Sequence, residues 1–210
     1  SLRGAGGRGG PATATTAPPP RTPLTTPRAG RAAAGAALWQ VGAPQALYAD
    51  APAKTSPAHW LILGETPAAS LQPDGGFDAL AGETGTLLGN MLRAARLPSA
   101  ASVLFVPLAR LLPSSPAQSG LADALAPLLA ETRPDIVLLM GRLAAQAALT
   151  TDEPLGHLRG RVHRLHGCAA VLTYDAAHLL RNPDNKARAW DDLCLATQFA
   201  GNLPPSPGRA

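Results

Sequence analysis

Short apolar runs alternate with amphipathic stretches between residue 57 and residue 200. Four of these runs are rich in Leu, Ile, Val and Ala, at residues 59–64, 102–106, 135–141 and 169–173. Continuous apolar runs of this length are typical of strands that are buried on both faces. Gly64 and Gly141 close two of the runs, as expected where a strand passes into a loop.

The stretches that follow these runs have helical spacing. Residues 86–95 place Leu88, Met91 and Leu92 on one face, and Pro98 ends the pattern. Three further helices are expected over residues 120–132, 142–149 and 185–199. Strands that alternate with helices predict an α/β fold, namely a three-layer α/β/α domain with a mainly parallel central sheet over residues 57–200.

The two ends of the chain have a different composition. Residues 1–35 consist mostly of Gly, Ala, Pro, Thr and Arg, with Leu2 and Leu24 as the large apolar side chains. Such a segment buries too little apolar surface to offset its ordering entropy, so we expect a disordered N-terminal arm. Three interpretations are open: a solvated tail, a segment translated from an upstream start, or an arm whose arginines touch DNA phosphates. Residues 201–210 are expected to form a disordered tail.

Residues 36–56 form an apolar segment followed by a linker. Large side chains are concentrated between Ala37 and Tyr48, and Pro52 and Pro57 then separate this segment from the first apolar run. The pattern is typical of a docking peptide or of a first helix packed on the core.

Charge is unevenly distributed along the chain. The formal net charge is +4, but the first 31 residues contain five arginines and no acidic residue, which leaves 13 basic and 14 acidic residues over 32–210. The folded part is therefore close to neutral, which argues against a basic DNA-wrapping domain.

Few residues offer metal or disulfide chemistry. Cys168 and Cys194 are too few for a disulfide framework or a cysteine-based cluster, and they favour a cytoplasmic protein with reduced thiols. No run is long enough to span a membrane, and the start lacks the apolar core of a signal peptide. His157, His163 and His166 alternate with arginines, a pattern compatible with a metal or phosphate site or with the solvated face of a hairpin. No Cys or carboxylate lies at ligand spacing with them, which favours the solvated face, so we expect no metal and no cofactor.

Ligands of parallel α/β sheets bind at the carboxyl ends of the strands. This rule brings residues 64–67, the Pro107 region, Gly141 and residues 173–175 to one edge of the predicted sheet. We therefore expect the ligand-binding or catalytic residues at this edge of the sheet.

The motifs along this edge resemble the uracil-DNA glycosylase superfamily, especially its family 4. The resemblance rests on residues 64–67, 85–92, 138–146, 158–160 and 173–193, and covers most of residues 60–195. It implies the glycosylase fold and a pocket that receives an extruded base.

The same resemblance implies that the pocket is degenerate. Asp175 and Ala176 stand where the family has a His-Pro pair, and Pro107 and its neighbours offer no amide where the family has Asn. Leu80 matches the stacking aromatic residue, which Phe77 replaces only if the loop is shifted, and the cluster cysteines are missing. The degenerate pocket is accordingly predicted to contain Gly64, Glu65, Leu80, Pro107 and Asp175.

If the protein retains catalytic activity, that activity would depend on few side chains. Glu65 could orient a water or stabilise an oxocarbenium ion, whereas a carboxylate at Asp175 would repel a departing base anion. His178 lies three residues after the expected position of the catalytic histidine, but the chain continues directly into Leu179–Arg181, and at helical or turn spacing His178 would point elsewhere. The candidate catalytic residues, if the protein is active, are Glu65, Asp175 and His178.

A second resemblance is to the psi subunit of bacterial DNA polymerase III, a non-catalytic family with a glycosylase-like fold. Residues 38–45 are similar to its N-terminal docking peptide. This resemblance implies binding of the clamp-loader tau or gamma subunits by the peptide and of the chi subunit by the domain, with DNA contacted weakly or indirectly. The candidate partner-binding residues are Leu38, Trp39, Val41, Gly42 and Tyr48.

Two functions follow as hypotheses. The first is a psi-like replication accessory built on an inert glycosylase domain. The alternative is an atypical glycosylase that excises a damaged base other than uracil. In either case a local excess of basic residues over 159–188 is a candidate DNA-facing edge, formed by Arg159, Arg161, Arg181 and Lys186.

Overall fold

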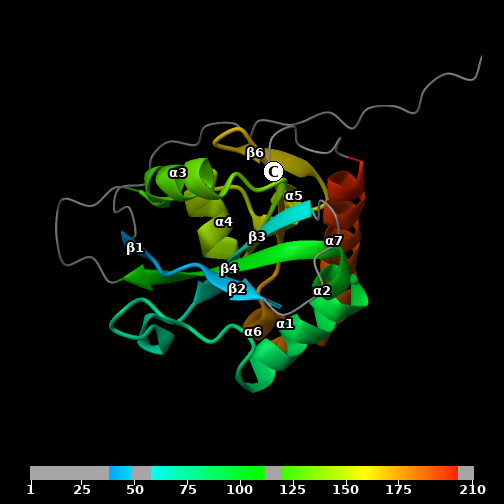
Figure 1. Cartoon of the computed structure of the whole chain (residues 1–210), viewed down its shortest axis with the longest axis horizontal. Coiled ribbons are helices and arrows are strands. Elements are labelled where there is room, and N and C mark those ends of the chain that lie inside the picture. Colours follow the sequence, from blue (N-terminus) through cyan, green and yellow to red (C-terminus); the bar gives the residue numbers. More distant parts are fainter. Residues whose placement is uncertain (1–37, 49–57, 112–119, 203–210) are drawn as a thin grey trace, which may run out of the picture.

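The computed structural model describes residues 38–48, 58–111 and 120–202. Its centre is a seven-stranded sheet in the order β1-β4-β3-β5-β7-β6, with β2 also paired to β4 (Figure 1). The strands are β1 (Leu38–Val41), β2 (Gln45–Leu47), β3 (Ala58–Thr66), β4 (Ala101–Leu111), β5 (Ile136–Met140), β6 (Val162–Leu165) and β7 (Cys168–Thr173).

The four inner strands are parallel and the outer ones are not. Strands β4, β3, β5 and β7 run in one direction, while β1 and β2 pair antiparallel with β4, and β6 pairs antiparallel with β7. The four inner strands are the four apolar runs of the sequence, so the prediction of a mainly parallel central sheet is confirmed.

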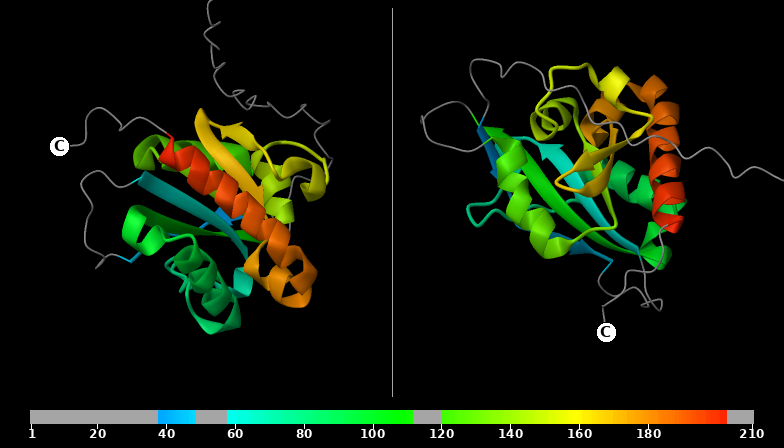
Figure 2. Two further views of the ribbon diagram at one scale, coloured as in Figure 1. Left: turned by 90° about the vertical axis from the view of Figure 1, so that its right-hand side faces the viewer. Right: turned by 90° about the horizontal axis from the view of Figure 1, so that it is seen from above.

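Helices cover both faces of the sheet. The main helices are α1 (Gly82–Ala94), α3 (Leu121–Thr132), α4 (Arg142–Ala148) and α7 (Lys186–Gly201), and the shorter ones are α2 (Leu97–Ala100), α5 (Leu155–Leu158) and α6 (Ala176–Arg181). Two 3-10 turns, η1 (Ala68–Ser70) and η2 (Pro183–Asn185), lie in connections. Helices α3, α4 and α5 pack on one face, and α1, α2 and α7 on the other (Figure 2).

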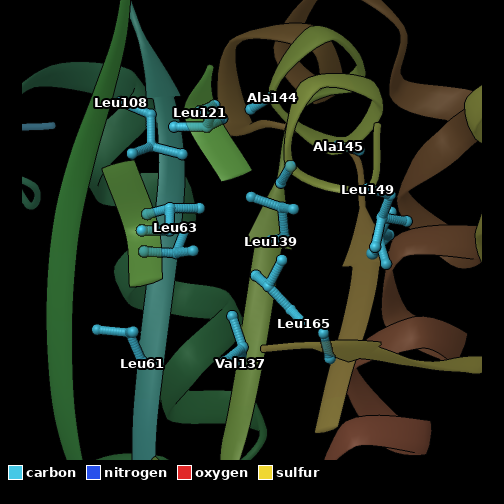
Figure 3. Close-up of a cluster of buried hydrophobic side chains, with 14 of the residues drawn as sticks. Leu61, Leu63, Leu108, Leu121, Val137, Leu139, Ala144, Ala145, Leu149 and Leu165 are labelled. Atoms are coloured by element: carbon cyan, nitrogen blue, oxygen red, sulfur yellow. The ribbon is translucent and has the colours of Figure 1, made fainter. Parts of the chain in front are cut away.

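Alternation along the strands produces two separate cores. On β3, Leu61 and Leu63 face α3 and α4, whereas Trp60 and Ile62 face the layer of α1 and α7. Figure 3 shows the first core, where strand leucines meet Ala144 and Ala145 of α4. Successive side chains of a strand point to opposite faces, so a strand covered on both sides must be apolar throughout.

The N-terminal segment is the main correction to the sequence-based fold. Residues 38–47 form neither a separate peptide nor a helix, because β1 and β2 pair along β4. Leu38 and Trp39 are each 7% exposed, and Trp39 belongs to the core beside α3. The large side chains that made this segment resemble a docking peptide are buried within its own domain.

The other candidate partner-binding residues of that segment are also engaged within the fold. Val41 packs against the core beside α3, and Tyr48 packs against the opposite core. Gly42 is buried and donates its N–H to the Pro107 carbonyl at 2.9 Å. The expected arm over 1–35 lies outside the described residues, as does most of the tail expected over 201–210. The first residue of that tail, Gly201, is instead the last residue of α7.

Candidate functional site

A cavity of about 80 Å³ opens at the carboxyl ends of the parallel strands. Its walls come from the end of β3 (residues 64–67), the loop before α1, the first turns of α1, and residues 175–177 after β7. This is the edge where the fold was expected to bind a ligand. A volume of this size has room for several water molecules.

Aromatic side chains form the apolar wall of the cavity. The rings of Phe77 and Phe105 stack with centroids 5.8 Å apart and planes 21° apart. Gly64 allows this arrangement, because a Cβ at that position would lie 2.5 Å from Phe105 Cζ. Phe77 thus presents a ring at the pocket, as the shifted-loop alternative required.

Two residues of the predicted pocket lie elsewhere. Leu80 is 37% exposed and is absent from the cavity wall. Pro107 is buried beneath Gly42, and its ring would touch a Cβ there. The prediction was wrong for Leu80 because it assumed a fixed spacing between the loop and α1, and for Pro107 because β4 continues past it to Leu111. Gly64, Glu65 and Asp175 do line the cavity.

The N-terminal segment holds the loop that carries Phe77. Ala43 donates its N–H to the Gly75 carbonyl at 3.0 Å, and Gln45 Oε1 accepts the Ala79 N–H at 3.3 Å. These contacts bracket Phe77 on both sides. Residues 38–47 therefore help to build the pocket wall, a role that the sequence pattern does not reveal because it depends on the pairing of β1 and β2 with β4.

Glu65 connects β3 to the start of α4. Its Oε2 accepts the N–H groups of Leu143 and Ala144 at 3.1 and 3.2 Å. Gly141 has φ 124° and leaves room for this side chain, since a Cβ there would lie 2.4 Å from Glu65 Cβ. A carboxylate at this place satisfies N–H groups that a helix start leaves unpaired.

Burial shifts the acidity of Glu65. Loss of solvent raises the pKa of this carboxyl above its ordinary value, and the negative charge of Asp175 also raises it. The N–H groups of Ala144 and Leu143 and the charge of Arg142 oppose that increase. Desolvation is the largest effect, as expected for a carboxyl group at the base of an apolar cavity.

Asp175 is the N-cap of α6. Its Oδ1 accepts the His178 N–H at 2.8 Å, which is the usual bond of an aspartate at a helix start. The Asp175 carboxylate is therefore engaged in holding the start of α6. Its carboxylate still lines the cavity.

His178 lies outside the cavity wall. Its ring stacks on Tyr174 with centroids 4.8 Å apart, and its Nε2 lies 2.9 Å from Asn185 Nδ2. These contacts fix the ring over the turn before α7. His178 therefore does not occupy the place of a displaced catalytic histidine, because α6 directs it away from the residues that form the cavity.

The predicted DNA-facing edge divides into two kinds of residue. Arg159 points into the protein, where its Nε lies 2.9 Å from Asp192 Oδ2 and its guanidinium covers the Tyr174 ring at 5.6 Å. Arg161 pairs with Glu153 at 3.4 Å. Arg181 and Lys186 are exposed. The DNA-facing prediction is wrong for Arg159, whose side chain is 15% exposed, because the buried carboxylate of Asp192 requires a charged partner.

Asp192 and His163 are buried polar residues that the sequence interpretation missed. Asp192 is fully buried on α7 and also accepts the Gly160 N–H at 3.0 Å. His163 lies within the β6–β7 hairpin rather than on its solvated face, and its Nε2 is 2.5 Å from the Leu158 carbonyl oxygen. Burial lowers the pKa of His163 and raises that of Asp192. The available signal was helical spacing, because Ala189 and Ala196, three residues before and four residues after Asp192, are also buried on α7.

Two further properties concern metals and membranes. Within residues 38–48, 58–111 and 120–202, no three His, Cys, Asp or Glu side chains gather as a metal site would require. No helix in those same ranges combines the length and the apolar character of a membrane span.

Comparison with protein families identifies the family of this chain. Residues 53–194 match the model of the family described as the Uracil DNA glycosylase superfamily. The search of curated proteins found no match. The matched range contains the cavity and all four parallel strands.

Proposed function

Because this chain belongs to the uracil DNA glycosylase superfamily, we propose that it keeps the fold of these enzymes without their chemistry and serves as a non-catalytic accessory of DNA replication. One observation carries the proposal: Glu65 and Asp175, the two carboxylates at the cavity, are both engaged at helix starts. A side chain that holds a helix start is poorly placed to transfer protons during a reaction.

The composition of the cavity supports the same conclusion. Excision of a base requires groups that stabilise the negative charge growing on the departing ring. Among the described residues, the wall of the cavity includes no His, Lys, Arg, Asn or Gln side chain. The two carboxylates present there would repel an anion.

The accessory role follows from the resemblance to the psi family. That resemblance suggests two partners, the clamp-loader tau or gamma subunits and the chi subunit. Residues 38–48 are paired and packed within the domain, so we assign partner binding to the outer surface of the folded domain instead of to a free peptide. An interaction scaffold needs the core of the fold and not its catalytic groups.

A binding experiment tests this proposal directly. The purified full chain is mixed with purified tau or gamma subunit and with chi, and complexes are detected by analytical gel filtration and calorimetry. We expect a stable complex with at least one of these subunits, unchanged in Glu65→Ala. Absence of any complex with all three subunits would contradict the accessory role.

A second candidate is an atypical DNA glycosylase, favoured by the open cavity and its Phe77 wall. An aromatic ring beside an apolar cavity is suited to stacking of an extruded base. In this case Glu65 would act on a water or on the sugar cation, with Asp175 beside it.

Base release separates the two candidates. Duplexes that contain uracil, hypoxanthine or xanthine are incubated with the wild-type protein and with Glu65→Ala. The accessory role predicts no release above that of buffer for either protein. Base release by the wild type that is lost in Glu65→Ala would instead establish glycosylase activity and contradict the non-catalytic proposal.

A further inference from the structure

An apolar groove of about 230 Å³ runs between α1 and the segment of α6 and α7. One wall consists of Leu87, Met91 and Ala94, which recur at the helical spacing of α1. The other wall consists of Leu179 and Trp190. Helices α1 and α6 lie side by side at this place (Figure 1).

Trp190 is the exposed anchor of this groove. It is 40% exposed, whereas Ala189 and Leu193 on the same helix are buried in the domain. Tryptophan is the residue type most enriched among those that dominate binding energy at interfaces. An apolar groove lined by a half-exposed tryptophan is therefore suited to receive a large apolar side chain.

The charge of the groove is positive. Lys186 is the charged residue of its wall among the residues that the structure describes, and it lies one helical turn before Trp190. Arg93 donates a hydrogen bond at 2.6 Å to Asn90, which also lines the groove. Asp184 and Asp191 belong to the same region of the chain but lie outside the groove wall.

This charge disfavours the chain's own arm as the occupant. Residues 1–34 contain five arginines and no acidic residue, so they would bring like charge to Lys186. An occupant that complements the groove carries carboxylates beside an apolar anchor.

We propose that the groove of Leu87, Met91, Leu179, Lys186 and Trp190 docks an acidic amphipathic segment of a partner protein, with an apolar side chain against Trp190 and a carboxylate near Lys186. The inference rests on the proposed accessory function for its biological setting, since an adaptor needs a docking surface. Helix-in-groove binding supplies the geometry, with anchors at the spacing of a helix.

Synthetic peptides of stated chemistry test the groove. The acidic probe is a helix of about 12 residues with Leu on one face and Glu elsewhere. A second peptide replaces every Glu with Lys, and a third replaces every Leu with Ala. Binding is followed by fluorescence anisotropy of labelled peptide and by amide chemical shifts of the full protein. We expect only the acidic peptide to bind, with shifts centred on α1 and α7 and with affinity that falls as salt rises.

Matched variants locate the site. Trp190→Ala should weaken binding by about 30-fold, and Leu180→Ala, which changes an exposed leucine outside the groove wall, should leave it unchanged. Lys186→Glu should weaken the acidic peptide about 10-fold and improve the basic one, whereas Arg188→Glu on the same helix should do neither. Circular dichroism of each variant verifies that it is folded.

Several results would overturn the inference. These are equal binding of the acidic and basic peptides, equal effects of Lys186→Glu and Arg188→Glu, and no effect of Trp190→Ala. A concentration-dependent dimer that Trp190→Ala dissociates would assign the groove to a second copy of this chain instead.

The inference and the proposed function can fail separately. Binding of the acidic peptide without capture of tau, gamma or chi would support the proposed docking groove and contradict the proposed role in replication. If a clamp-loader subunit is captured equally well by the wild type and by Trp190→Ala, the accessory role is supported and the groove is not its docking site.

Discussion

Trp39 and Trp190 lie in two regions that use a large aromatic side chain in opposite ways. Trp39 stands on β1, which pairs along β4, and is 7% exposed against α3. Trp190 stands on α7 and is 40% exposed beside an apolar groove. A tryptophan side chain carries a large apolar surface that favours burial, either in its own domain or against a partner. The topology decides which of these applies.

The two regions also differ in what surrounds them. Strand β1 covers the outer edge of β4, and its Leu38 and Trp39 side chains are buried within the domain. The groove beside Trp190 is formed by side chains of helices that are already folded, and nothing in the described residues fills it. Stability therefore depends on the first region, and we expect binding to depend on the second.

The largest expected effect distinguishes the two tryptophans directly. Trp39→Ala removes a buried side chain from the core and should lower the free energy of unfolding by about 3–5 kcal/mol. Trp190→Ala removes a side chain that is already half in water and should lower it by about 1 kcal/mol. Urea denaturation followed by circular dichroism measures both. Equal losses would remove the distinction between the regions.

The sequence predicted the first region least well and the centre of the fold best. Residues 59–64 and 135–141 can be predicted as buried strands, because each contains an uninterrupted apolar run, which suits a strand covered on both faces. Residues 38–47 are too short for periodicity to separate strand, helix and peptide. Their structure is decided by pairing with β4, which is more than 50 residues away in the sequence.

The candidate site shows the same limit. Gly64, Glu65 and Asp175 were predicted correctly as pocket residues because they lie at or just after the carboxyl ends of β3 and β7, a position that the strand pattern determines. Phe77 and Leu80 lie in a loop, where the sequence does not determine which side chain turns inward. Contacts from Ala43 and Gln45 decide that question in favour of Phe77.

Gly42 provides the next largest effect. In Gly42→Ala the new Cβ would lie 2.5 Å from Pro107 Cγ and 2.8 Å from the Gly75 carbonyl oxygen. The strand, the proline or the loop must move, and we expect a loss of about 1–3 kcal/mol in thermal or urea unfolding. Gly156→Ala is the matched control, because nothing lies within 4 Å of its added Cβ. An equal result for the two variants would contradict the proposed tight contact.

Gln45 tests the connection from the N-terminal segment to the pocket wall. Gln45→Ala leaves the Ala79 N–H without its acceptor and should lower stability by about 1 kcal/mol. The more specific expectation is faster amide exchange around Phe77, with exchange in α7 unchanged. Gln198→Ala, at an exposed position of α7, is the control. Unchanged exchange near Phe77 would show that the segment does not hold this loop.

The smallest expected effect concerns the pH dependence that Glu65 contributes. Burial raises the pKa of its carboxyl in the folded protein, so the folded chain keeps this proton to a higher pH than the unfolded chain does. The free energy of unfolding is then highest, for this group, below the ordinary pKa, and it falls as pH rises through the raised one. Glu65→Gln retains an oxygen that can accept the Leu143 and Ala144 N–H groups but cannot ionise. Its stability relative to the wild type should therefore increase as pH rises from below the ordinary pKa of a glutamate through the raised one, as measured by urea denaturation at each pH. A relative stability that stays flat or decreases would mean that the helix-start N–H groups outweigh desolvation at this carboxylate.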